Sequence, residues 1–242
     1  MGLDFSIFVE HGPAILEGFW LTLKIVLGAL VLGLPLGVLL ALGRRSARLL
    51  FRWPAVAFIE VFRNTPFMIQ VFLIYYVLPF YGVRLPAEMV GVLALAAFGS
   101  AYYAEVIRAG IEAIPEGQFD SARALGLSDW QQMRLIVLPQ TLPIILPPLG
   151  NQTLSLVKES AILSTITVQE MTMTALKVQG ATFRPFEAFI MVALLYWALN
   201  ETIAMGLRAY ERRLSRRQTR KATAVRRVPG GQPLGAGTGA RM

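Results

Sequence analysis

Polar and charged residues interrupt two of the long apolar stretches of this sequence, and their side chains have the chemistry to recognise a polar solute. The first group comprises Arg63, Thr65 and Gln70. The second group comprises Asn151, Ser155, Lys158, Glu159 and Ser160. Ionisable groups are costly inside a membrane and are retained where they face a water-filled path, a bundle interior or one another. Both groups are therefore candidates to line a path for a polar solute.

A structural role is the alternative for the charged members of these groups. Arg63 would then lie at the cytoplasmic interface, while Lys158 and Glu159 would pair with neighbouring side chains. Asn151, Ser155 and Lys158 or Glu159 recur at intervals of about four residues, which places them in one stripe on a helix. We expect that stripe to face the bundle interior or an aqueous path, because contact with lipid is costly.

A docking surface is indicated by the polar segment from Glu112 to Pro139, which lies between apolar stretches. Pro115 suits the first turn of a helix, and Gly126 stands where a glycine with positive φ ends one. Ser128 and Gln131 match a capping box that starts a second helix. The predicted helix, glycine bend and helix would suit a piece that projects from a membrane to engage a cytosolic partner. A capped surface helix without a partner is the alternative.

No motif for bond-making chemistry is evident. The sequence contains no GxxxxGK[ST] phosphate loop, so we do not expect the chain to bind ATP through one. It also contains no GxSxG nucleophile elbow and no HExxH zinc motif. The chain has no cysteine, and its single histidine, His11, is expected to be a surface residue near the N-terminus. We therefore expect no catalytic residue, no metal site and no cofactor bound by this chain.

The composition is that of an integral membrane protein. Of the 242 residues, 55% are hydrophobic and only 16% are charged, whereas soluble domains average about 25% charged residues. The net charge of +8 comes largely from the end of the chain, where ten of the 23 Lys and Arg lie in the last 35 residues. Basic clusters beside apolar spans report topology, so we expect no nucleic-acid partner.

We expect an all-α protein with about five transmembrane helices. They are predicted at about 19–42, 66–81, 88–104, 141–163 and 186–207. The basic loop from Arg44 to Arg52 is placed in the cytoplasm by the positive-inside rule, which puts the N-terminus outside. An odd number of spans then places the basic tail 211–242 inside, where we expect it to be disordered.

Two local features of the spans carry further predictions. Gly33 and Gly37 form a small-xxx-small pair that would allow close helix approach, although such glycines are also ordinary in membrane helices. Pro143, Pro147 and Pro148 remove backbone donors at the entry of the fourth span and are predicted to kink or delay that helix.

The polar segment resembles the "EAA" cytoplasmic loop of ABC importer permeases. The matching residues are Asp120-Ser121-Ala122, Gly126 after three residues, and Ile136-Val137-Leu138-Pro139 after nine more. Asp and Ser replace the usual Glu and Ala at the first two positions, which keeps an acid and a small residue. The runs Leu146–Asn151 and Phe62–Pro66, with Gln70, are similar to the subgroup that imports polar amino acids of the glutamate, glutamine, arginine and histidine type. The resemblance covers roughly residues 14–210.

The resemblance implies a permease domain over residues 1–210 in the bacterial cytoplasmic (inner) membrane, crossing it several times. It implies docking of cytosolic ABC ATPase subunits, which would bind ATP and Mg, on the polar segment. The coupling residues would be Asp120, Ser121, Ala122, Arg123, Gly126, Ile136, Leu138 and Pro139. A second permease subunit, identical or related, and an extracytoplasmic solute-binding protein would complete the importer. In the substrate path, Arg63 would meet the carboxylate of an amino acid and Glu159 its ammonium group.

Two other functions are considered beside this one. A secondary transporter or channel driven by an ion gradient would favour internal repeats with broken helices at matching positions, and no repeat is seen. A scaffold without transport activity would not need the polar stripe of the fourth span. The sequence leaves the transported amino acid, the choice between homodimer and heterodimer, and the role of the tail open.

Overall fold

The computed structural model describes residues 6–226, and this part of the chain is helical and contains no strand. The long helices are α2 (Gly12–Arg44), α3 (Leu49–Asn64), α5 (Ala87–Glu112), α8 (Leu138–Glu159), α9 (Met171–Thr182) and α10 (Pro185–Arg226). The short helices are α1 (Ser6–Glu10), α4 (Phe67–Phe72), α6 (Glu116–Ala124) and α7 (Asp129–Gln132). The 3-10 and π-helical turns are η1 (Leu73–Val77), η2 (Leu78–Tyr81), η3 (Met133–Val137) and η4 (Ser160–Ile166). The all-α prediction is confirmed.

Four continuous helical segments of the described chain are long and apolar enough to cross a membrane. They are Gly12–Arg44, Ala87–Glu112, Asp129–Ile166 and Pro185–Arg212. Each of them contains one of the predicted spans. A fifth crossing is present only if Leu49–Asn64 and Phe67–Tyr81, which meet at an angle of 113°, are counted as one span.

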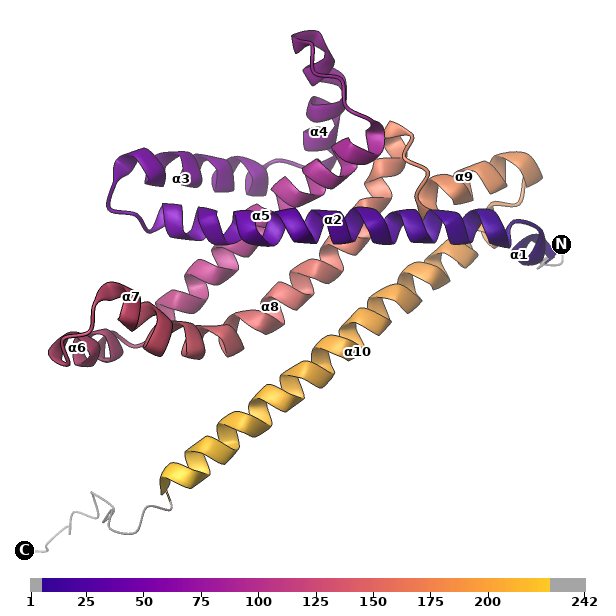
Figure 1. The fold of residues 1–242 in the computed structure, drawn as a ribbon. Coiled ribbons are helices and arrows are strands. Elements are labelled where there is room, and N and C mark those ends of the chain that lie inside the picture. Colours follow the sequence, from indigo (N-terminus) through magenta and orange to yellow (C-terminus); the bar gives the residue numbers. More distant parts are fainter. Residues whose placement is uncertain (1–5, 227–242) are drawn as a thin grey trace, which may run out of the picture.

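The second predicted span, 66–81, corresponds to the helical segment Phe67–Tyr81, which follows α3 after a sharp bend. The cause lies at Thr65 and Pro66, which both adopt extended backbone, with φ −115° and ψ 144° at Thr65. A residue before proline is excluded from the helical region by the proline ring, so α3 stops at Asn64. The chain restarts as α4 in a new direction (Figure 1).

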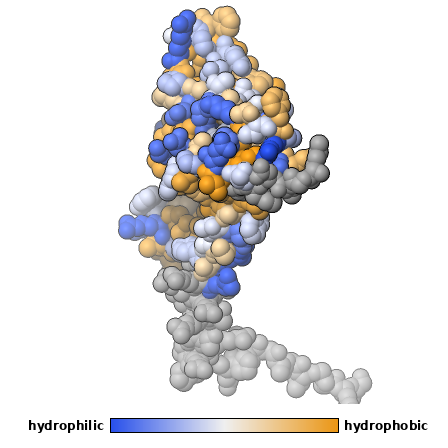
Figure 2. Space-filling model, turned by 90° about the vertical axis from the view of Figure 1, so that its right-hand side faces the viewer, coloured by the Kyte–Doolittle hydropathy of each residue, from blue (hydrophilic) through white to orange (hydrophobic). Residues whose placement is uncertain are grey.

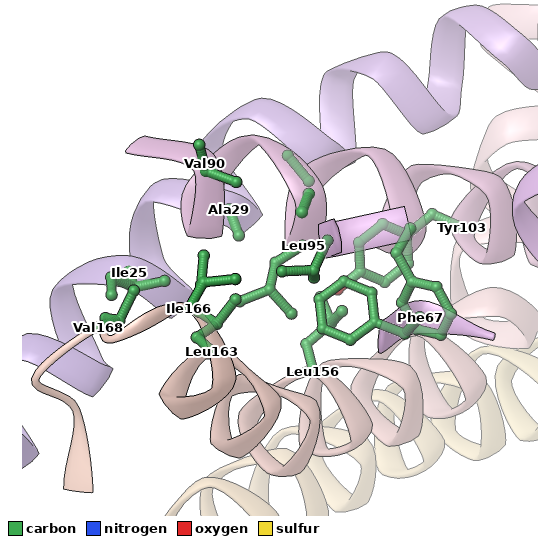
Figure 3. Packing of buried hydrophobic residues seen from close by; sticks show 14 residues of the cluster. Ile25, Ala29, Phe67, Val90, Leu95, Tyr103, Leu156, Leu163, Ile166 and Val168 are labelled. Atoms are coloured by element: carbon green, nitrogen blue, oxygen red, sulfur yellow. The ribbon is translucent and has the colours of Figure 1, made fainter. Parts of the chain in front are cut away.

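The core forms where α2 crosses α5. A Cβ atom added at Gly33 would lie 3.0 Å from the carbonyl oxygen of Ala96, and one added at Gly37 would lie 2.7 Å from Cβ of Tyr103. Only glycine permits this distance between the two backbones, so the predicted close approach is confirmed. Figure 3 shows the buried side chains beside this crossing, which come from α2, α4, α5, α8 and η4.

The prolines of the fourth span do not delay its helix, so this part of the prediction is wrong, while the predicted kink stays a prediction. Pro143, Pro147 and Pro148 all lie inside the continuous helix α8. A proline ring clashes with the carbonyl four residues earlier, and the π-helical turn η3 lies immediately before α8. The wider turn gives room for Pro139, the first proline of the run. A π-helical turn thus precedes the proline-containing part of α8.

The two ends of the bundle carry different elements. In Figure 1, α1 and α9 lie near the start of α2, whereas α6, α7 and the connection from α2 to α3 lie at the far end. Figure 2 looks onto the first of these ends and shows hydrophilic side chains spread among hydrophobic ones. Helix α10 runs toward the α6 end and continues to Arg226. The expected disorder of the tail 211–242 stays a prediction, and residues 227–242 lie outside the described chain.

Candidate coupling surface and substrate path

Helix α6 ends in a glycine cap. Gly126 has φ +72°, and a Cβ atom added there would meet nothing within 4 Å. Its N–H donates to the carbonyl of Arg123 at 2.9 Å, and the N–H of Leu127 donates to the carbonyl of Ala122 at 3.1 Å. These two bonds form a Schellman motif. The prediction that Gly126 ends the helix with a positive φ is confirmed.

Helix α7 begins directly after this cap with the predicted capping box. The N–H of Ser128 donates to Oε1 of Gln131 at 2.9 Å, and the N–H of Gln131 donates to Oγ of Ser128 at 3.4 Å. Nε2 of Gln132 donates to the carbonyl of Leu127 at 2.9 Å. The bend is thus hydrogen-bonded on both sides, which holds α6 and α7 in one relative orientation.

A small apolar cluster attaches α6 to the spans. Ile111 and Ile114 at the end of α5 are buried with Val137 of η3, and Phe119 of α6 and Met133 pack against them. Burial of apolar surface contributes about 25 cal/mol per Å², so this cluster stabilises the position of α6. A displacement of α6 must therefore move the ends of α5 and α8.

The outer side of α6 and α7 is exposed and mixed in character. We call the exposed residues Asp120, Ser121, Arg123, Leu125, Gly126 and Trp130 the α6–α7 surface. Oδ1 of Asp120 lies 3.5 Å from Nη2 of Arg123. An exposed pair of this kind contributes at most about 1 kcal/mol, so both side chains are free to pair with a partner.

Two corrections concern the predicted coupling residues. Ala122 is only 1% exposed and faces the chain's own interior, so it supports the surface from below and does not contribute to it. Leu125 and Trp130, which were not predicted, are 77% and 68% exposed. The sequence feature that could have identified them is an apolar residue on each side of the glycine bend that does not fit the helical spacing of the buried apolar residues. Among the other predicted residues, Leu138 and Pro139 are exposed and Ile136 is half-buried.

A groove lies beside α6. Its volume is about 570 Å³. The lining residues come from the ends of α2 and α5 and from α6: Arg45, Ile111, Glu112, Ile114, Glu116, Phe119, Asp120 and Arg123. The groove continues the exposed side of α6 and carries charges of both signs.

An ion-pair cluster joins α2, α3 and α5 close to this groove. Its centre is Glu105, whose Oε2 lies 3.1 Å from Nη1 of Arg44 and 3.7 Å from Nη1 of Arg63. Arg108 pairs with the other oxygen of Glu105 and also with Glu112. Sequence reasoning missed this cluster, because its members lie far apart in the chain.

Arg63 belongs to this cluster, where its guanidinium group pairs with Glu105. Besides its contact with Glu105, its guanidinium carbon lies 5.5 Å from the ring centroid of Tyr102. Both contacts favour the structural role that was the alternative for Arg63.

Thr65 and Gln70 hold the bend between α3 and α4. Nε2 of Gln70 donates to the carbonyl of Phe62 at 2.8 Å, to the carbonyl of Thr65 at 3.1 Å and to Oγ1 of Thr65 at 2.9 Å. The carbonyls at the end of α3 lose helical partners when the helix stops, and Gln70 supplies donors for them. Oε1 of Gln70 is buried and accepts no hydrogen bond from the described residues.

The polar stripe of α8 does not face the interior of the single chain, so of the two expected positions only one along an aqueous path or a second subunit is left. Asn151 and Lys158 are exposed and Ser155 is half-buried. The buried side of α8 carries Leu156 and Val157, because these side chains pack on the core formed with α5. The stripe thus lies on the outer surface of the single chain.

Glu159 and Ser160 lie at the end of α8. The carboxyl of Glu159 is half-buried. Ser160 is buried, and its Oγ donates to the carbonyl of Val157 at 2.7 Å. Ser160 therefore satisfies the backbone where α8 tightens into η4.

The two groups of predicted substrate residues lie on or beside helical segments that contact each other. Helix α4 contacts η4, and Phe67 of α4 shares a buried cluster with Leu156 and Leu163 (Figure 3). The segment after the bend at Thr65 and the end of α8 therefore contribute to the same apolar cluster.

A buried carboxylate outside the spans was also missed. Glu170, which precedes α9, has 0% exposure. It accepts hydrogen bonds from the N–H of Met173 at 2.8 Å, the N–H of Thr172 at 2.9 Å and the hydroxyl of Tyr196 at 2.7 Å. Burial raises the pKa of Glu170, and these three hydrogen bonds partly offset the rise. The carboxyl group caps α9 and ties it to α10.

Comparison with known proteins gives consistent results. Residues 33–216 match the model of the family described as binding-protein-dependent transport system inner membrane component. The chain is 37% identical over 215 residues to the arginine transport system permease protein ArtQ of Bacillus subtilis, covering 88% of this chain and 98% of that protein. It is 33% identical over 216 residues to the glutamine transport system permease protein GlnP of Escherichia coli K12, and this match covers 88% of this chain and 99% of that protein.

Solved structures agree. The crystal structure of an amino acid ABC transporter with histidines contains a chain that is 39% identical to this one, with a TM-score of 0.83. The match covers 88% of this chain and 100% of that chain. A chain of the MetNI methionine ABC transporter, at 22% identity and a TM-score of 0.68, shares the fold.

Proposed function

The chain belongs to the family of binding-protein-dependent transport system inner membrane components, and we propose that it carries polar L-amino acids across the bacterial inner membrane as one subunit of an ATP-driven importer. It is a permease subunit of an ABC transporter and not an enzyme. The match to an amino acid ABC transporter at 39% identity and a TM-score of 0.83 is the observation that carries the choice of substrate class. The comparisons support this function over a transporter or channel driven by an ion gradient.

The α6–α7 surface is proposed to receive a cytosolic ATPase subunit, which holds the ATP and Mg. Its exposed Leu125 and Trp130 offer apolar area, and Asp120 and Arg123 offer charges of both signs. The cluster of Ile111, Ile114 and Val137 then transmits a movement of α6 to α5 and α8. This assignment places the α6 end of the bundle in the cytoplasm and the N-terminal end outside, where a solute-binding protein would dock.

The substrate path is proposed to run along the outer side of α8 and the bend at Thr65. In a pair of permease subunits, the exposed stripe of Asn151, Ser155 and Lys158 would face the second subunit across an aqueous path. The amide oxygen of Gln70 and the carboxyl of Glu159 would accept hydrogen bonds from an ammonium group, and Lys158 would meet a carboxylate. Arg63 is left out of this path because it is engaged with Glu105.

The test is uptake of labelled amino acids into proteoliposomes that contain the chain, its ATPase and its binding protein. Gly126→Asp adds a side chain where φ is +72° and a charge on the α6–α7 surface. We expect it to abolish ATP-dependent uptake and association of the ATPase. Gly180→Asp is the control for association of the ATPase, since Gly180 is an exposed glycine of α9 with open space around it, at the other end of the bundle.

ATPase-dependent uptake that is lost in Gly126→Asp, with association of the ATPase that survives Gly180→Asp but not Gly126→Asp, supports the proposal. Uptake by the chain alone, unchanged by Gly126→Asp, would overturn it. Uptake of a different class of solute would overturn the proposed substrate alone.

A further inference from the structure

The first two turns of α3 expose a continuous apolar surface. Leu49, Leu50, Phe51 and Trp53 each leave more than half of their surface uncovered. The opposite side of α3 is buried through Ala55 and Ile59, which pack against α2 and α5. Figure 1 shows α3 at the edge of the bundle. Since exposed apolar area costs about 25 cal/mol per Å² in water, this surface requires an apolar cover.

Two arginines accompany this apolar surface. Arg48 and Arg52 are exposed, and neither forms an ion pair with any residue in the described part of the chain. They lie one helical turn apart, because the N–H of Arg52 donates to the carbonyl of Arg48 at 3.2 Å. Arg44, four residues earlier, differs from them in having carboxylates of Glu60 and Glu105 as partners. Two guanidinium groups on one face of α3 thus lack a counter-charge.

A hollow lies between the apolar and the charged side chains. It has a volume of about 240 Å³ and is lined by Leu49, Arg52, Trp53 and Val56. Arg52, Trp53 and Val56 lie three, four and seven residues after Leu49, so the four residues share one face of the helix. The hollow therefore combines one guanidinium group with the sides of a tryptophan and two aliphatic residues.

This face of α3 lies beside the end of the first membrane span, at the level where the membrane meets water. The first span ends at Arg44, and the short connection before Leu49 brings the chain back beside the end of that span. Trp and Arg are enriched at this level of membrane proteins, where an apolar body meets acyl chains and a polar head meets phosphate. The uncovered apolar residues and the unpaired arginines are thus present together at one membrane interface.

We propose that this face of α3 is a binding site for an anionic phospholipid, with the headgroup phosphate on Arg48 and Arg52 and an acyl chain over Leu49 and Trp53. Arginine pairs with phosphate through two parallel hydrogen bonds. A neutral lipid would cover the apolar residues but would leave the two positive charges uncompensated. The proposal concerns this chain alone and does not depend on the amino acid that it carries.

The experiment measures quenching of Trp53 fluorescence in phosphatidylcholine vesicles that contain the purified full chain. Phosphatidylglycerol with brominated acyl chains is titrated in, and brominated phosphatidylcholine serves as the neutral comparison. The chain has four tryptophans, so the Trp53→Phe variant is measured in parallel and its quenching is subtracted. The remaining signal belongs to Trp53.

We expect Trp53 to be half-quenched at a lower mole fraction of phosphatidylglycerol than of phosphatidylcholine. Each of Arg48→Gln and Arg52→Gln is expected to weaken this preference roughly fivefold, as expected for one basic residue near an anionic surface. Arg84→Gln is the matched control, because Arg84 is an exposed arginine in the connection between η2 and α5, away from this face.

Equal quenching by the two lipids in the wild-type chain would overturn the proposal. So would a preference that survives in the double variant Arg48→Gln, Arg52→Gln. Quenching that disappears from the wild-type chain when the ATPase subunit is added would show that a protein covers this face, and would also overturn it.

Discussion

Nη1 of Arg44 donates a hydrogen bond to Oε2 of Glu105 at 3.1 Å, although 61 residues separate the two along the chain. The bond joins the end of α2 to α5 near the point where α5 leads into α6. Arg63 of α3 and Arg108 of α5 contact the same carboxylate. The negative charge of Glu105 is therefore shared by three arginines, one from each of α2, α3 and α5. The conformations of α2, α3 and α5 are coupled at this carboxylate.

Glu105→Gln is expected to lower the free energy of unfolding by about 2 kcal/mol. The carboxylate is 19% exposed, and removing one partner of a poorly exposed ion pair leaves the other charges uncompensated. Glu112→Gln is the matched control, because Glu112 also pairs with Arg108 but is 49% exposed, where a pair contributes about 0–1 kcal/mol. Thermal unfolding of the detergent-solubilised chain compares the two. Equal losses of unfolding free energy in both variants would contradict the conclusion that Glu105 stabilises the fold more than Glu112 does.

Gly126→Ala is expected to strain the end of α6 by about 1–2 kcal/mol, because an L-residue with a side chain disfavours left-handed backbone. Gly117→Ala, in the first turn of α6, is expected to be neutral or stabilising, since alanine favours helix over glycine. Added Cβ atoms meet nothing within 4 Å at either position, so any difference is conformational. Hydrogen exchange of the amides at positions 126 and 127 measures this difference. Exchange should be faster in Gly126→Ala than in the wild-type chain, and unchanged in Gly117→Ala. Unchanged exchange in Gly126→Ala would show that the bend does not depend on the glycine.

Gln70→Met is expected to cost about 2–3 kcal/mol of stability. It removes the three hydrogen bonds that Nε2 donates to Phe62 and Thr65, and a hydrogen bond contributes about 0.5–1.5 kcal/mol. Thr65→Val removes the hydroxyl, which accepts from Gln70 and donates to the carbonyl of Val61 at 2.8 Å, but leaves both donations from Gln70 to carbonyls in place, and it is expected to cost about 1 kcal/mol. Chemical unfolding of the two variants gives the order. A Gln70→Met chain with unchanged stability but without uptake would instead place Gln70 in direct contact with the substrate.

The stability of the chain is expected to depend on pH through Glu170. Burial raises the pKa of its carboxyl group in the folded state, while an unfolded chain has the ordinary pKa of about 4.3. The stabilisation is therefore fully present below the unfolded pKa and is lost as the pH rises through the folded pKa. Glu170→Gln should remove this pH dependence, at a constant cost for the altered cap of α9. Melting temperatures of both chains between acidic and neutral pH test this, and parallel curves would exclude Glu170 as the source.

The polar stripe of α8, formed by Asn151, Ser155 and Lys158, is expected to be accessible to water in the assembled importer. The natural chain has no cysteine, so single cysteines can be placed without a background. Asn151→Cys and Lys158→Cys should react with a membrane-impermeant maleimide, whereas Leu156→Cys, at a position with 0% exposure, should not. Leu142→Cys is the sharper control, since Leu142 is exposed on the same helix but is apolar. Equal labelling of Leu142→Cys and Asn151→Cys would contradict an aqueous path along the stripe.

Local order proved predictable from short runs of residues. The positive φ of Gly126 and the capping box of Ser128 and Gln131 depend on interactions within six residues, and both are confirmed. The four continuous spans follow from the length of apolar stretches, which a membrane constrains directly. The close approach at Gly33 and Gly37 was also indicated by spacing alone.

Contacts between distant parts of the chain could not be derived in this way. That Glu105 receives Arg44 and Arg63, that Ala122 is buried and Leu125 is exposed, and that the stripe of α8 faces outward all depend on which helix faces pack together. The same side chain, Arg63, is consistent with a substrate path or an ion-pair cluster until its neighbours are known. The sequence by itself therefore determined the helices, the glycine bend and the family, because these depend on local backbone preferences, apolar length and motif spacing. Only the tertiary structure decided the partners of the charged groups, because those follow from the packing of α2, α3 and α5.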